Sequence, residues 1–261
     1  MIELFGFLAS LGIGLSLGLI GGGGSILTVP VLVYLFHLDP LLATSYSLFI
    51  VGSTSAVGAV PYFRQQLIDF RSAVYFGIPS IISVFLTRHY ILDLIPEQLV
   101  QLGEFTLSKD MAIMLLFAVL MFFAALKMIG KHVSKPVDSG NNYLLPLILQ
   151  GTGVGLISGL IGAGGGFLII PALIIFNGMP MKTAIGTSLL IIAANSLFGF
   201  IGNLDLQRID WTFLLSITGI AMVGILLGSK FSQRIDGKKL KPIFGWFVLL
   251  MAFVIIVQEL K

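Results

Sequence analysis

Two runs rich in glycine interrupt long apolar stretches of this 261-residue sequence, at 21–24 and at 162–166. A helix that begins after a glycine turn presents unpaired N–H groups and the positive end of its dipole. Glycine also permits positive φ and lets a ligand approach the backbone closely. The runs therefore predict a site in which two facing helix N-termini hold a small oxyanion without an arginine. The alternative is that the glycines only allow helices to pack closely, as small residues do in membranes.

Polar residues form a matched stripe on the apolar segment that follows each glycine run. The stripes have helical spacing and consist of Ser47, Thr54 and Gly58 in the first half and of Ser188, Asn195 and Gly199 in the second. Hydroxyl and amide groups can donate hydrogen bonds to a small oxyanion. Asn195 is the stronger candidate because it lies well inside an apolar run and has a polar counterpart, Thr54. The alternative is hydrogen bonding between helices or back to the same helix.

Together the runs and stripes give the predicted substrate-binding residues. They are Gly22, Gly23, Gly24, Ser25, Ser47, Thr54, Gly164, Gly165, Gly166, Ser188 and Asn195. No catalytic residue, metal site or cofactor motif is predicted, because no Asp, Glu, Lys or Arg falls in the middle of an apolar run and the sequence has no ATP-binding loop. Asp69 and Asp210, which each precede an apolar run, are predicted as helix N-caps rather than proton-coupling carboxylates.

The elements that must position these residues are membrane helices. The sequence is 57% hydrophobic and only 10% charged, against about a quarter charged residues in soluble domains. Several windows also exceed the roughly 18–20 apolar residues that cross a bilayer. The apolar runs are 4–20, 25–38, 41–63, 70–91 and 111–130, followed by 143–161, 166–177, 181–202, 211–230 and 240–260.

The chain repeats itself at an offset of 141 residues. Between Gly12–Leu32 and Gly153–Leu173, twelve of twenty-one positions are identical, which indicates a duplication. The polar, turn-rich segment 131–142 separates the halves. We therefore predict a first transmembrane repeat over 1–130, a cytoplasmic linker over 131–142 and a second repeat over 143–261.

The glycine runs also decide between two topologies. If the first two apolar runs of each half form one helix, the repeats are parallel and the fifteen Lys and Arg divide almost evenly between the faces. If they form a hairpin, the repeats are inverted and eleven basic residues lie on one face, with only Arg88, Lys109, Arg208 and Lys261 opposite. The positive-inside bias favours the hairpin. A single helix over 4–36 would also reach about 50 Å, well beyond a ~30 Å hydrocarbon core.

The predicted fold is thus an all-α integral membrane protein with two inverted-topology repeats, each with a glycine-hinged helical hairpin followed by three transmembrane helices. Both termini are expected outside. The segment 92–108 mixes polar and apolar residues and is interpreted as a short amphipathic helix or a solvated connector on the outer face.

Gly18–Ser25 with Pro30, Gly159–Gly166 with Pro171, and the segment Ala184–Leu189 are the most distinctive motifs of the sequence. In these motifs, and over essentially its whole length, the sequence resembles the sulfite exporter TauE/SafE family of membrane permeases. Members of that family are implicated in moving sulfite, sulfonates, thiosulfate and related anions. The stretch Arg88–Lys109 departs from the family by being longer and more polar.

These observations predict a secondary transporter of sulfite or small organosulfur anions, bound at the midplane between two broken helices. The alternative is a transporter or channel for an unrelated small anion or a neutral solute. An enzyme is not predicted, because the spans lack paired carboxylates, a His cluster or an activated nucleophile. The expected partners are the anion and the lipid bilayer of a bacterial cytoplasmic membrane, without nucleic acid, and homo-oligomerisation is left open.

Overall fold

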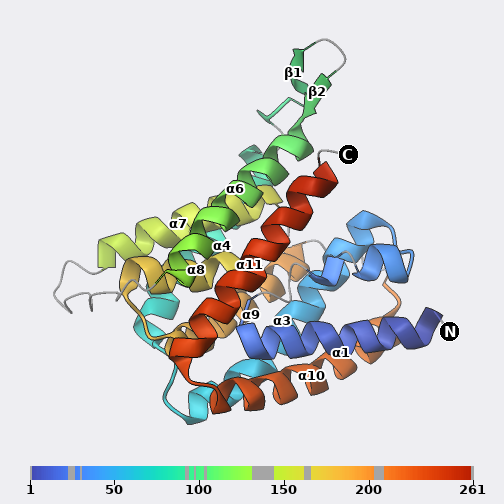
Figure 1. Ribbon diagram of the computed structural model, residues 1–261. Helices are drawn as coiled ribbons and strands as arrows, with labels where there is room; N and C mark the ends of the chain where they lie inside the picture. The colour runs from blue at the N-terminus through green and yellow to red at the C-terminus, as the bar shows by residue number, and fades with distance from the viewer. Residues whose placement is uncertain are drawn as a thin grey trace.

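The computed structural model describes residues 2–22, 27–29, 31–91, 94–96, 98–102, 105–130, 144–161, 166–202 and 209–259. These residues are almost wholly helical (Figure 1). Five of the described helices are long and apolar enough to cross a membrane, and four shorter apolar helices accompany them. The predictions of a helical fold and of a multi-pass integral membrane protein are therefore confirmed.

The helices follow the apolar runs of the sequence. In the first half they are α1 (Ile2–Ile20), the π-helix η1 (Val31–Leu35), α3 (Pro40–Arg64), α4 (Phe70–Leu86), the π-helix η2 (Thr87–Ile91) and α6 (Lys109–Ile129). In the second half they are α7 (Leu144–Ile161), α8 (Gly166–Asn177), α9 (Met181–Gly202), α10 (Trp211–Arg234) and α11 (Gly237–Glu259). The linker 131–142 lies outside the described residues.

Two aspartates begin helices at equivalent places. The Oδ1 atom of Asp69 accepts a hydrogen bond from the backbone N–H of Ser72 at 3.1 Å, and Oδ1 of Asp210 accepts one from the N–H of Phe213 at 3.0 Å. Each side chain satisfies a donor that the first turn of a helix leaves unpaired. The prediction that Asp69 and Asp210 are N-caps is confirmed.

The closest helix packing joins one half of the chain to the other. α1 runs along α10, and α4 runs along α7. A methyl group added at Gly14 would overlap the backbone carbonyl oxygen of Ala221, and one added at Gly155 would overlap that of Ser80. Gly155 follows Gly14 by 141 residues, and Ala221 follows Ser80 by the same offset. The two packed pairs are therefore copies of one contact.

Helices α3 and α9, which are repeat counterparts, cross in opposite directions. A Cβ atom built at Gly58 would lie 3.6 Å from Cδ1 of Leu189, and one built at Gly199 would lie 3.5 Å from Cδ1 of Leu48. The contact moves toward the start of α3 as it moves toward the end of α9, so the two helices are antiparallel. By interpolation between these contacts, the crossing centres on 53–54 and 194–195.

The last helices of the two halves are antiparallel as well. Gly245, in the early part of α11, packs against Ala125 and Ile129 at the end of α6. In Figure 1 the two helices lie side by side, and the C-terminal end of α11 is close to the start of α6.

In each half, the chain after the glycine run returns to the start of the half's first helix. The start of α1 meets the residue after η1, because a Cβ atom at Gly6 would overlap the ring of Phe36. In the second half, Nδ2 of Asn177 at the end of α8 donates to Oε1 of Gln150 near the start of α7, at 2.9 Å. In this half the start of α7 and the end of α8, which are the helix ends farthest from the glycine run in sequence, therefore lie together.

The segment between η2 and α6 contains two paired strands among the residues that the structure describes. Strand β1 (Gln98–Leu102) pairs antiparallel with β2 (Phe105–Ser108). The interpretation of an amphipathic helix over 92–108 is therefore wrong for these residues. Phe105–Ser108 alternates apolar and polar side chains with a period of two, which is the pattern of a strand.

Many large apolar side chains point away from the protein. Phe123, Trp246 and Phe253 are 62%, 61% and 67% exposed. In water such surfaces would be costly, but in a bilayer they face acyl chains. The interior holds both apolar and small polar residues, including fully buried Thr54, Ser80 and Ser188.

Candidate functional site

The structure describes part of each glycine run. Gly21, with φ of 84°, and Gly22 follow the end of α1 and are buried, and Gly166 begins α8 and is buried. The predicted donors Gly23, Gly24, Ser25, Gly164 and Gly165 lie outside the described residues.

Gly21 and Gly166 pack against one helix of the second half, α9. A Cβ atom at Gly21 would press on Ile185 of α9, and also on Ile170 of α8, while one at Gly166 would press on Ile192 of α9. Residues 185 and 192 are two helical turns apart, about 10 Å along the axis. Gly21 and Gly166 therefore contact α9 at two points that are separated by two helical turns.

Ser188 occupies that interval. It lies three residues after Ile185 and four before Ile192, so all three share one face of α9. The side chain is fully buried, and its Oγ donates to the carbonyl oxygen of Ile185 at 2.8 Å. Ser188 of the predicted stripe on α9 thus lies between the contacts of Gly21 and Gly166.

The counterpart stripe on α3 is buried too. Thr54 Oγ1 donates to the carbonyl oxygens of Ile50 at 2.5 Å and Val51 at 3.2 Å, and Ser47 is 6% exposed. In this arrangement the hydroxyls of Thr54 and Ser188 use their single proton within their own helices. They can donate to a ligand only after rotating about χ1.

Asn195 is hydrogen-bonded to a different helix, α4. Its Nδ2 donates to Oγ of Ser80 on α4 at 3.0 Å, and its Oδ1 is buried without a partner among the described residues. The opposite orientation of the amide would let the Ser80 hydroxyl donate to Oδ1 and would exchange the positions of Oδ1 and Nδ2. Asn195 can therefore present either an acceptor or a donor there.

Two further polar residues were missed by the sequence reasoning. Ser55 and Ser196 are fully buried, and neither hydroxyl has a partner in the part of the chain that the structure describes. They stand at the repeat offset from each other, next to Thr54 and Asn195. The identity of a serine at both positions was the signal that would have found them.

The starts of α4 and α10 are each hydrogen-bonded to a side chain of the other half. The backbone N–H of Asp69 donates to Oγ1 of Thr187 at 3.0 Å, and the N–H of Asp210 donates to the hydroxyl of Tyr46 at 2.6 Å. Thr187 and Tyr46 are repeat counterparts on α9 and α3. Each half thereby anchors the start of α4 or α10 on the central helix of the other.

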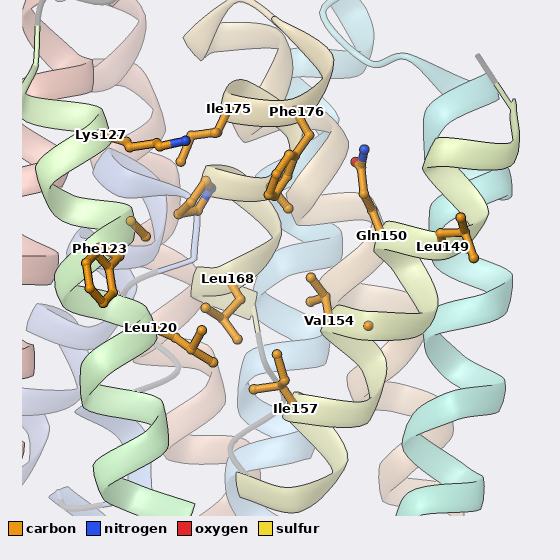
Figure 2. A pocket seen from close by; sticks show the side chains of 14 residues that line it. Leu120, Phe123, Lys127, Leu149, Gln150, Val154, Ile157, Leu168, Ile175 and Phe176 are labelled. Carbon is orange, nitrogen blue, oxygen red and sulfur yellow. The ribbon is translucent and has the colours of Figure 1, made fainter. Parts of the chain in front are cut away.

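A groove of about 520 Å³ lies elsewhere, between α6, α7 and α8 (Figure 2). None of the predicted substrate-binding residues that the structure describes lines it.

Comparisons with known proteins bear on the whole chain. Residues 6–255 match the family described as Sulfite exporter TauE/SafE. A probable membrane transporter protein of Xylella fastidiosa strain 9a5c is 30% identical over 254 residues, covering 94% of this chain and 91% of its own. A probable membrane transporter protein of Methanocaldococcus jannaschii is 26% identical, and the match covers 91% of this chain and 92% of that protein. A probable membrane transporter protein of Bacillus subtilis is 23% identical, and the match covers 89% of each chain.

Proposed function

This chain belongs to the sulfite exporter TauE/SafE family of membrane transporters, and on that premise we propose that it carries sulfite or a small organosulfur anion across the bacterial cytoplasmic membrane. The anion binds between the two glycine turns, near the middle of the bilayer. We propose secondary transport: the sequence contains no ATP-binding loop, so primary pumping would need a separate subunit.

The observation that carries this proposal is the position of Gly21 and Gly166 on either side of Ser188. Irregular glycine backbone at membrane depth is tolerated where it is buried in protein or lines a cavity. Here Gly21, Gly22 and Gly166 are buried, and Gly21 and Gly166 pack against α9 on either side of the buried hydroxyl of Ser188. Backbone N–H groups of residues 23–25 and 164–166, with Ser188, Ser47, Thr54 and Asn195, then supply donors to a tetrahedral or pyramidal oxyanion.

Opposed helix directions support the inverted arrangement of the repeats. Two equivalent helices that touch and run antiparallel, as α3 and α9 do, are related by an axis across the helices, hence in the plane of the membrane. The crossing at 53–54 and 194–195 then lies on that axis. Alternating access by one half moving against the other follows from such a fold.

Cysteine labelling tests the topology. Because the chain has no native cysteine, single cysteines at Ser139 and at Lys239 report directly on membrane sides. Both are expected to react only when a membrane-permeant reagent is used on intact cells, since both lie on the basic, cytoplasmic face. Reaction of one position, but not the other, with an impermeant reagent would contradict the inverted topology.

Uptake into proteoliposomes tests the function. Purified protein is expected to exchange labelled sulfite or a short sulfonate across the membrane. Gly24→Ala and Gly165→Ala should each lower affinity about ten- to a hundredfold, because a turn forced out of its glycine conformation loses a donor to a charged ligand.

Ser25→Ala keeps the backbone N–H and is the matched control, with a much smaller effect. Normal affinity in both folded glycine variants would show that the anion does not bind at the glycine runs. Exchange of an unrelated anion or a neutral solute, without any sulfur anion, would instead favour the alternative substrate class.

A further inference from the structure

The groove between α6, α7 and α8 has the composition of a lipid site. Its lining is almost entirely apolar, and its floor includes Leu168 and Ala172 of α8, which are 8% and 5% exposed. Its rim is open: Phe123, Leu149 and Phe176 are 62%, 63% and 60% exposed. Because α6 has a membrane-spanning stretch over 111–129, this opening faces the bilayer.

Polar groups gather at one end of the groove. In Figure 2, Lys127 and Gln150 lie at the same end as Phe176, while Leu120 and Ile157 lie toward the other. Lys127 is exposed, two residues before the end of α6, and the described part of the chain pairs no carboxylate with it. Gln150 accepts from Asn177 through Oε1, which leaves its amide N–H groups to donate.

We propose that this groove binds one acyl chain of an anionic phospholipid, whose phosphate pairs with Lys127 and accepts a hydrogen bond from Gln150. An unfilled apolar groove of this size inside a bilayer would forfeit packing contacts, and the acyl chains of neighbouring lipids are the groups available to fill it. The cationic end selects an anionic headgroup, as basic pockets between membrane helices do. On the topology proposed above, the lipid belongs to the cytoplasmic leaflet.

Gly153 offers a way to close the groove without disturbing the protein. It lines the groove, and a Cβ atom built there has nothing within 4 Å. Its repeat counterpart Gly12 is equally unobstructed but does not line the groove. Gly153→Trp and Gly12→Trp are therefore a matched pair in which only the first fills the lipid site.

Native mass spectrometry of the full delipidated chain tests the proposal, with dioleoyl phosphatidylglycerol and dioleoyl phosphatidylcholine as probes. The wild-type protein is expected to retain phosphatidylglycerol about fivefold better, the worth of one lysine near an anionic headgroup. Gly153→Trp should lower that retention at least tenfold, and Gly12→Trp should leave it unchanged. Lys127→Gln should remove the preference between lipids, whereas Lys230→Gln, an exposed lysine on α10, should keep it.

Three results would overturn the proposal. Equal retention of phosphatidylglycerol by Gly153→Trp and the wild-type protein would place the lipid elsewhere. Equal retention of both lipids by the wild-type protein would show that Lys127 does not select an anionic headgroup. Slower anion transport by Gly153→Trp with unchanged lipid retention would make the groove a path for the anion instead. Because Lys127 is exposed, its variant is expected to fold even if the tryptophan variant does not.

Discussion

Gly14→Ala is expected to destabilise the protein by about 3 kcal/mol, the upper part of the usual range for overpacking a well-packed interior. The added methyl group meets the backbone carbonyl of Ala221, which belongs to α10 and cannot rotate away as a side chain can. Gly155→Ala should have a similar effect, because it meets the carbonyl of Ser80 in the equivalent contact. Equilibrium unfolding in mixed detergent micelles would measure both losses.

Gly12→Ala and Gly153→Ala are the matched controls. Each lies two residues away in the same helix, and a Cβ atom at either has nothing within 4 Å. Alanine favours a helix by up to about 1 kcal/mol over glycine, so these variants should be neutral or slightly more stable. A loss at Gly12 and Gly153 as large as that at Gly14 and Gly155 would show that the backbone contacts between the halves are not what holds the helices together.

Asn195→Leu is expected to lower the affinity for sulfite at least a hundredfold while the protein remains folded. The substitution replaces the amide by an apolar side chain of similar size, which fills the same space but has no N–H group. Both N–H groups of Asn195 can reach the anion when the amide is oriented so that the Ser80 hydroxyl donates to Oδ1. A lost hydrogen bond to a charged ligand is worth about 1.5–3 kcal/mol, and two such bonds account for this change. Isothermal titration with sulfite would measure it.

Two other variants separate binding from packing. Ser80→Ala removes the hydroxyl that is hydrogen-bonded to the amide of Asn195, so it should cost stability but reduce affinity less than tenfold. Asn177→Leu removes a buried amide at the outer end of α8 and should leave affinity within about threefold, since an amide–amide bond does not involve the ligand. Equal effects of Asn195→Leu and Ser80→Ala would assign Asn195 to helix packing alone.

The helices could be predicted from the sequence, because each segment that crosses a membrane must be apolar and helical over a continuous stretch. Apolar runs locate the helices, and a carboxylate ahead of such a run locates a helix start, as Asp69 and Asp210 do. The paired strands Gln98–Leu102 and Phe105–Ser108 were not predicted, because a short segment that mixes polar and apolar residues fits either period until its pairing is known.

The side-chain partners of the site were less accessible. A repeat states which residues are equivalent but not which ones touch, so neither the packing of Gly14 on Ala221 nor the bond from Asn195 to Ser80 could be read from it. Both contacts join segments far apart in the sequence. The serines at 55 and 196 carried a usable signal, since they are identical in the two halves.

The packing of α1 along α10 has a consequence for synthesis of the protein in the cell. α10 begins about 190 residues after α1 ends, and at roughly 5–20 residues per second the ribosome needs about 10–40 s to make that length. For that time α1 stands in the bilayer with its glycine face against lipid. A nascent chain that stops before Trp211 never supplies the missing helix, which makes it a candidate for recognition by membrane proteases.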